Sequence, residues 1–70
     1  MKPCNIGEKI FELRKSLNIS QQKLAKEIGV SQKAIDFWEK GINEPKATYV
    51  LNLAKFFGVS CDYLLNNEDI

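Results

Sequence analysis

Apolar residues recur along the chain at steps of three and four positions, with polar residues between them, which predicts amphipathic helices rather than strands. The first such stretch places Ile6, Ile10, Leu13 and Leu17 at helical spacing. Asn5 stands before it as an N-cap, and an acidic residue follows three positions later, so a helix is expected to begin at residue 6 and to end near residue 18.

The stretch from Ser20 to Gly41 predicts two short helices around a tight turn. Ser20 can cap the first helix, Gly29 can end it in a left-handed conformation, and Ser31 can cap the second only two residues later. A turn this short brings the apolar faces of both helices together and fixes the angle between them. The residues expected at this junction are Leu24, Ala25, Ile28, Val30, Ile35 and Trp38.

The rest of the chain also reads as helical. A helix is expected from about Ala47 to Phe57, with Val50, Leu51, Leu53, Ala54 and Phe57 directed inward. Its cap position holds Lys46, a poor capping residue. Ser60 can cap a fifth helix with Tyr63, Leu64 and Leu65, and the polar tail 66–70 is expected to fray. We therefore predict an all-α, compact five-helix domain over 1–70, with its core at about 6–65.

The outer faces of the two central helices are mostly polar, and we expect the residues on these faces to have no partner within the protein. They are Gln21, Gln22, Lys23 and Lys26 on the first helix, and Gln32, Lys33, Asp36 and Phe37 on the second. Amide and amine groups near a helix N-terminus match the hydrogen-bonding pattern of the major groove of DNA.

Charge and composition narrow the range of functions. The net charge is only +1, but residues 1–33 hold seven basic and three acidic residues, whereas residues 34–70 hold three basic and six acidic residues. This asymmetry can orient the domain on a polyanion, or it can reflect scattered solvated lysines. The sequence has no membrane-length apolar run and no signal peptide, so a cytoplasmic protein is expected.

The sequence does not indicate a disulfide, a metal site or a catalytic site. Cys4 and Cys61 are isolated and the chain has no histidine, so neither a disulfide framework nor a zinc site is expected. The sequence offers no nucleophile beside a base, no phosphate-binding glycine loop and too few residues for a ligand pocket. We predict no enzymatic activity, no metal, no cofactor and no small-molecule ligand.

The order of motifs resembles the Xre family of helix-turn-helix repressors, the group of the lambda phage repressor and Cro. The resemblance covers residues 6 to 65 and rests on motif residues that follow one another in order along the chain. These are Ser20-Gln21, Leu24-Ala25, Gly29-Val30-Ser31, Ile35, Trp38-Glu39-Lys40-Gly41, Pro45, Leu53-Ala54, Gly58-Val59-Ser60 and Asp62-Tyr63-Leu64-Leu65. It implies an all-α domain that binds operator DNA, usually as a dimer.

The resemblance also implies roles for single residues. Gln21 matches the position that holds a phosphate. Gln32, Lys33 and Phe37 match positions that touch base edges, where they suit adenine, guanine and the thymine methyl group respectively. Phe37 departs from the usual polar residue and can instead fold onto Trp38 or a dimer partner.

Other positions imply contacts to the DNA backbone or to the scaffold. Asp36 is a second departure, because it must accept from cytosine N4, be neutralised by Lys33 or Lys40, or remain a solvated charge. Ser31, Lys40, Asn43 and Lys46 match phosphate-binding positions, although exposed lysines are common on any surface. Arg14 and Glu39 match a structural ion pair between the first helix and the recognition helix, which is expected over 32–39.

The predicted function is therefore a transcriptional regulator that represses by operator occupancy. It is expected to act as a homodimer on an inverted repeat in double-stranded DNA. Phe56, Tyr63 and Leu65 are the expected dimer contacts. The alternative is a protein-protein interaction module built on the same fold, such as an antitoxin or regulatory partner.

Overall fold

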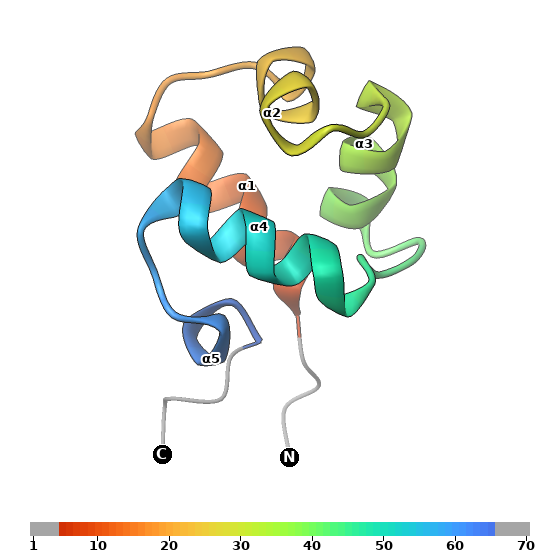
Figure 1. Cartoon of the computed structure of the whole chain (residues 1–70). Coiled ribbons are helices and arrows are strands. Elements are labelled where there is room, and N and C mark those ends of the chain that lie inside the picture. Colours follow the sequence, from red (N-terminus) through yellow and green to blue (C-terminus); the bar gives the residue numbers. More distant parts are fainter. Residues whose placement is uncertain (1–4, 66–70) are drawn as a thin grey trace.

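The computed structural model describes residues 5–65, which form five helices and no strand (Figure 1). The helices are α1 (Ile6–Ser16), α2 (Gln21–Ile28), α3 (Gln32–Lys40), α4 (Ala47–Phe57) and α5 (Cys61–Leu64). This confirms the all-α prediction, and α3 extends one residue beyond the expected range. The predictions for Cys4 and for the tail 66–70 fall outside the described residues.

The helix-turn-helix segment is built by its capping residues. The hydroxyl oxygen of Ser20 accepts a hydrogen bond from the amide of Lys23 at 3.0 Å, and Ser31 accepts one from Ala34 at 3.1 Å. Gly29 ends α2 with a φ of 87°, a conformation that costs glycine little. Gly29 and Ser31 therefore define the two ends of the turn and Ser20 defines the start of α2, as the sequence predicts.

The remaining helices begin where their caps predict. Asn5 accepts a hydrogen bond from Glu8 at the start of α1, and Ser60 accepts one from Tyr63 at the start of α5. Lys46 precedes α4 without a side-chain capping bond. The first turn of α4 therefore keeps backbone amides that its cap residue does not satisfy.

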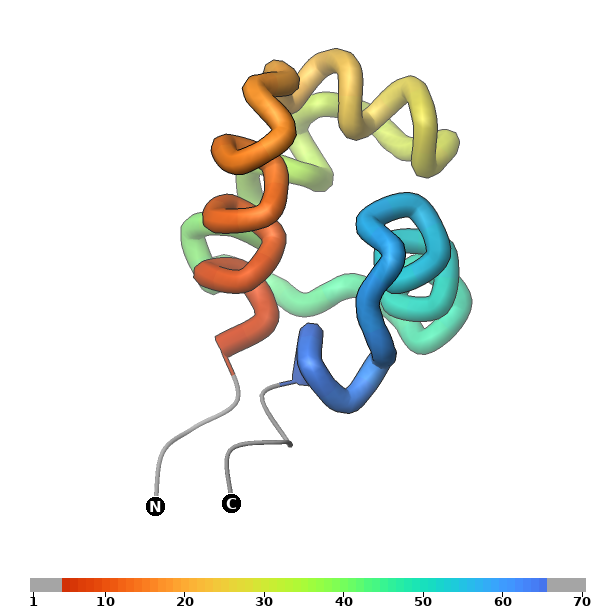
Figure 2. Tube along the Cα trace, turned by 90° about the vertical axis from the view of Figure 1, so that its left-hand side faces the viewer, coloured from red at the N-terminus to blue at the C-terminus, as the bar shows by residue number. Residues whose placement is uncertain are grey.

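One apolar core joins the five helices. Figure 2 shows α1 and α4 on opposite sides of the molecule, with α2 between them at one end and α5 at the other. The buried apolar residues are Ile6, Ile10, Leu24, Ala25, Ile28, Ile35, Trp38, Val50, Leu53, Ala54 and Leu64. The core thus holds α2 and α3 together at the end of the molecule away from α5.

Two expected core positions are wrong. Leu17 is 51% exposed at the C-cap position of α1, beyond the last helical residue. Leu51 is 49% exposed because it follows Val50 by one residue, which turns it about 100° away from the buried face. Phe57 is only half-buried, packed against the core from its edge.

Candidate nucleic-acid interface

The N-terminal ends of α2 and α3 enclose a shallow hollow of about 470 Å³. Its lining consists of Gln21, Gln32, Lys33 and Asp36. Gln32 and Lys33 are exposed in the first turn of α3, just after the cap Ser31. Four residues expected to face DNA therefore share one surface, and two of them, Gln32 and Lys33, are exposed.

Phe37 lies beside this hollow and is half-buried. The ammonium group of Lys33 lies 5.7 Å from the centroid of the Phe37 ring. Trp38 stacks at a tilt on Tyr49, with ring centroids 5.7 Å apart, rather than on Phe37. Lys33 and Phe37 thus form one unit on the outer face of α3.

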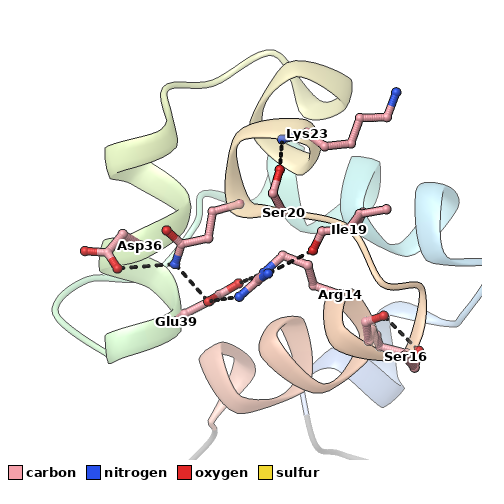
Figure 3. A network of polar contacts seen from close by, with 9 residues as sticks. Arg14, Ser16, Ile19, Ser20, Lys23, Asp36 and Glu39 are labelled. Atoms are coloured by element: carbon pink, nitrogen blue, oxygen red, sulfur yellow. Dashed lines mark hydrogen bonds and ion pairs between the residues drawn. The ribbon is translucent and has the colours of Figure 1, made fainter.

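Gln21 and Asp36 do have partners within the protein, so the expectation that they have none is wrong. The amide nitrogen of Gln21 donates to Asp36 at 3.2 Å and to Glu39 at 3.0 Å (Figure 3). Because an amide NH₂ has two hydrogens, both donors of Gln21 are occupied. A contact from Gln21 to a phosphate stays a prediction and requires one of these bonds to open.

Asp36 is paired on its other side as well. Its second carboxylate oxygen lies 3.1 Å from the Lys40 ammonium, one turn further along α3. Hydrogen bonds from Lys40 and then from Gln21 lower the pKa of the Asp36 carboxyl below its ordinary value of 3.8. The structure thus shows the pairing with Lys40 that was one of the alternatives for Asp36, and it engages Lys40 within the protein. A contact from Asp36 to cytosine stays a prediction.

The structure brings Arg14 and Glu39 together in a two-bond, fork-shaped pair. Arg14 Nε donates to Glu39 Oε2 at 2.7 Å, and Nη2 donates to Oε1 at 3.1 Å. Nη1 donates to the backbone oxygen of Ile19 at 2.9 Å. Both side chains are less than 10% exposed, so the pair connects α1, the segment before α2 and the end of α3 in a protected environment.

Gly7 is a second contact between α1 and α3 that the sequence reasoning missed. A Cβ atom at this position would lie 2.1 Å from the backbone oxygen of Trp38. Only a residue without a side chain allows this approach. The signal in the sequence is a glycine placed directly after a buried isoleucine in a helix, where glycine is otherwise unfavourable.

The loop between α3 and α4 carries the remaining expected backbone contacts. Asn43 and Lys46 are both exposed, with Lys46 at the uncapped start of α4. Glu44 is exposed between them. Lys46 therefore adds a cation to a helix N-terminus whose backbone amides can donate to an anion.

The residues expected at a dimer contact are only partly exposed. Phe56 packs edge-on against Phe57 at 5.3 Å, and Tyr63 lies under the ammonium group of Lys9 at 4.4 Å. Leu65 is 40% exposed. Larger exposed fractions occur at other apolar residues, which are Phe11, Leu17, Ile42 and Leu51. The expected contact residues are thus less exposed than these four apolar residues.

Known proteins are similar to this chain in sequence and in structure. The family model described as Helix-turn-helix (HTH_3) matches residues 10–64. Repressor protein C2 of Salmonella phage P22 is 43% identical over 63 residues, which is 90% of this chain and 29% of that protein. The transcriptional activator BcrR of Enterococcus faecalis is 38% identical over 64 residues, 91% of this chain and 31% of that protein. The chain thus spans about a third of the length of these relatives.

A solved structure matches over nearly the whole chain. The crystal structure of the P22 c2 repressor protein in complex with synthetic operator 9T has a TM-score of 0.86 and 40% identity. The match covers 97% of this chain and 100% of that one. Among the helices of residues 5–65, none has the length and apolar character needed to cross a membrane.

Proposed function

This chain belongs to the Xre-type helix-turn-helix family, and we propose that it is a sequence-specific DNA-binding transcriptional regulator that represses by occupying an operator. The observation that carries this proposal is the exposed first turn of α3, with Gln32 and Lys33 beside the hollow at the start of α2. A structure of similar fold over 97% of the chain is a repressor in complex with operator DNA. The proposed function needs neither a cofactor nor a catalytic group, and it places the protein in the cytoplasm with the DNA.

The surface divides into residues that read bases and residues that hold the backbone. Gln32 and Lys33, and beside them Phe37, stand where α3 enters the major groove. The proposed backbone contacts are Gln21 at the start of α2, Ser31 and Lys40 at the two ends of α3, and Asn43 and Lys46 in the loop that follows α3. Gln21 and Lys40 can reach a phosphate only when their contacts with Asp36 open. Backbone contacts set the orientation of the protein on the duplex, whereas base contacts supply the sequence preference.

Four alanine substitutions test this division on an operator selected from a random pool of duplexes. Gln32→Ala and Lys33→Ala are each expected to weaken operator binding by about 1 to 3 kcal/mol and to relax the preference at one base position. Gln21→Ala and Lys46→Ala are expected to weaken binding to all duplexes alike.

The matched control for Gln21→Ala is Gln22→Ala, because Gln22 is exposed on the same turn of α2 but does not line the hollow. It is expected to bind like the wild type. If all four alanine variants gave the same profile across operator variants, the division into reading and backbone-binding residues would be wrong.

We also propose that the unit bound to DNA is a two-fold dimer. One recognition helix reads too few base pairs to specify an operator, so two copies are needed on an inverted repeat with half-sites about 34 Å apart. The proposed contact consists of Phe56, Tyr63 and Leu65, of which the first two are half-buried and Leu65 is 40% exposed. Inserting about five base pairs between the half-sites turns one to the opposite face, and unchanged affinity would refute the dimer.

A protein-binding module is the second candidate, and one observation favours it. A cleft of about 580 Å³ lies along α1 and α3, and it is lined by Glu8, Phe11, Glu12, Arg14, Gln21, Asp36, Glu39 and Lys40. Phe11 is 46% exposed there, beside two acidic residues of its own helix. The salt dependence of DNA affinity separates the candidates, because only phosphate contacts give a steep negative slope.

A further inference from the structure

Asp36 is the one acidic residue in the hollow between α2 and α3, where it stands among Gln21, Gln32 and Lys33. A carboxylate on a DNA-facing surface opposes phosphate binding. Asp36 nevertheless links two polar side chains, because one of its carboxylate oxygens pairs with Lys40 and the other accepts a hydrogen bond from Gln21. From this geometry we propose that Asp36 restrains the sequence-independent affinity of the domain for DNA by engaging the two side chains that would otherwise hold the backbone. The inference rests on the proposed function.

The restraint on Lys40 is electrostatic. Lys40 Nζ lies 3.1 Å from Asp36 Oδ2, and the pair as a whole carries no net charge. Salt-dependent affinity arises from cations that replace condensed counterions at phosphates. While Lys40 is paired with Asp36, its charge is offset and it contributes less to the salt slope than an unpaired lysine would.

Gln21 is restrained because its amide group has no hydrogen left to donate to a phosphate. Its two amide hydrogens go to Asp36 and Glu39. Glu39 is only 6% exposed and also accepts two bonds from Arg14, so its position is fixed. The Asp36 side chain is 31% exposed, and its bond is the one that must open before Gln21 can donate to a phosphate.

Asparagine and alanine at position 36 separate these two restraints. Asp36→Asn removes the charge but keeps a side-chain oxygen for Gln21. Its log affinity for DNA is expected to fall more steeply with log salt concentration. The slope becomes more negative by about 0.9, the value of one added phosphate contact. Over a fourfold rise in salt, this corresponds to about a 3.5-fold greater loss of affinity than in the wild type.

Asp36→Ala also frees one hydrogen of Gln21. It is expected to show the same slope as Asp36→Asn but about two- to tenfold higher affinity at each salt concentration, because no neutral hydrogen bond between Gln21 and residue 36 has to open before Gln21 donates to a phosphate. Equal affinities of the two variants would refute the restraint on Gln21.

The chain offers a matched control for the charge change. Lys23 and Glu27 form a second ion pair of the same spacing and length, 3.1 Å, on α2. Lys23 points away from Asp36 in Figure 3. Glu27→Gln raises the net charge by the same amount as Asp36→Asn, yet it is expected to leave the salt slope at the wild-type value.

The measurement is the affinity of each variant for a mixed-sequence duplex of about two helical turns, across a series of salt concentrations. Adding Lys40→Gln to Asp36→Asn is expected to restore the wild-type slope. The inference is overturned if that double variant keeps the steep slope, if Glu27→Gln becomes equally steep, or if Asp36→Asn keeps the wild-type slope. Absence of binding by the wild type would instead refute the DNA-binding function, and this inference with it.

Discussion

Replacing Glu39 by glutamine tests the pair that connects α1 to the recognition helix, because the substitution keeps the shape of the side chain and removes its charge. Glu39 accepts from Arg14 through both oxygens, and its side chain is 6% exposed. In Glu39→Gln, an NH₂ group replaces one acceptor and faces the donors of Arg14. Arg14 then loses one hydrogen bond and its charged partner.

The expected cost follows from these contacts. A hydrogen bond to a charged group contributes about 1.5–3 kcal/mol, so we expect Glu39→Gln to lower the free energy of unfolding by about 2–3 kcal/mol. A domain of this size has a total stability of about 4–10 kcal/mol. The melting temperature is therefore expected to fall by about 10–20 °C.

Thermal unfolding followed by circular dichroism measures this loss, and a double-mutant cycle with Arg14→Met assigns it to the pair. Once Glu39 is glutamine, Arg14→Met is expected to add little, which gives a coupling energy of about 1–3 kcal/mol. Glu27→Gln removes an exposed ion pair and serves as the control, with an expected change below about 1 kcal/mol. Strictly additive losses from Arg14→Met and Glu39→Gln would show that the reasoning is wrong.

Three further substitutions test other parts of the structure. Gly7→Ala is expected to destabilise the protein by about 1–3 kcal/mol in chemical denaturation, although alanine favours helices, because its Cβ would collide with the Trp38 backbone oxygen. Lys46→Ser supplies the missing cap of α4, so it is expected to raise the free energy of unfolding by about 0.5–1 kcal/mol. It is also expected to weaken DNA binding in a filter assay, and a gain in both stability and DNA affinity would refute a phosphate contact at Lys46. Lys40→Gln is expected to raise the pKa of Asp36 toward its ordinary value in a carboxyl NMR titration, because the largest cause of its lowering is removed. In the wild type, the charged Asp36 carboxylate stabilises the fold at any pH above its ordinary pKa of 3.8. This stabilisation is lost as the pH falls through the lowered pKa that Asp36 has in the folded protein.

The local sequence predicted the elements of this fold because their ends depend on near neighbours. Ser20 and Ser31 each bind an amide three residues ahead, and Gly29 needs no distant partner to adopt its conformation. The apolar stripes predicted most of the core for the same reason. Leu51 shows the limit, since an apolar residue next to a buried one still turns to solvent when it lies off the stripe.

The candidate site was less predictable, because its network joins residues that only the interhelical angle brings together. Gln21 and Asp36 are fifteen positions apart on different helices, and nothing in the spacing within either helix shows that they meet. The pairing of Arg14 with Glu39 came from the family resemblance, although Arg14 does follow Ile10 by four residues on the buried face of α1. The approach of Gly7 to α3 depends equally on tertiary packing.

The affinity of the wild-type protein for its selected operator and for a scrambled duplex, each measured across a range of salt concentrations, tests the central claim most directly. For both duplexes, we expect log affinity to fall steeply and linearly with log salt, because Lys46 and the other backbone contacts displace counterions. The operator is expected to bind at least about a thousandfold more tightly at physiological salt, through Gln32 and Lys33. Equal affinity for the two duplexes, or affinity without salt dependence, would contradict a sequence-specific DNA-binding function.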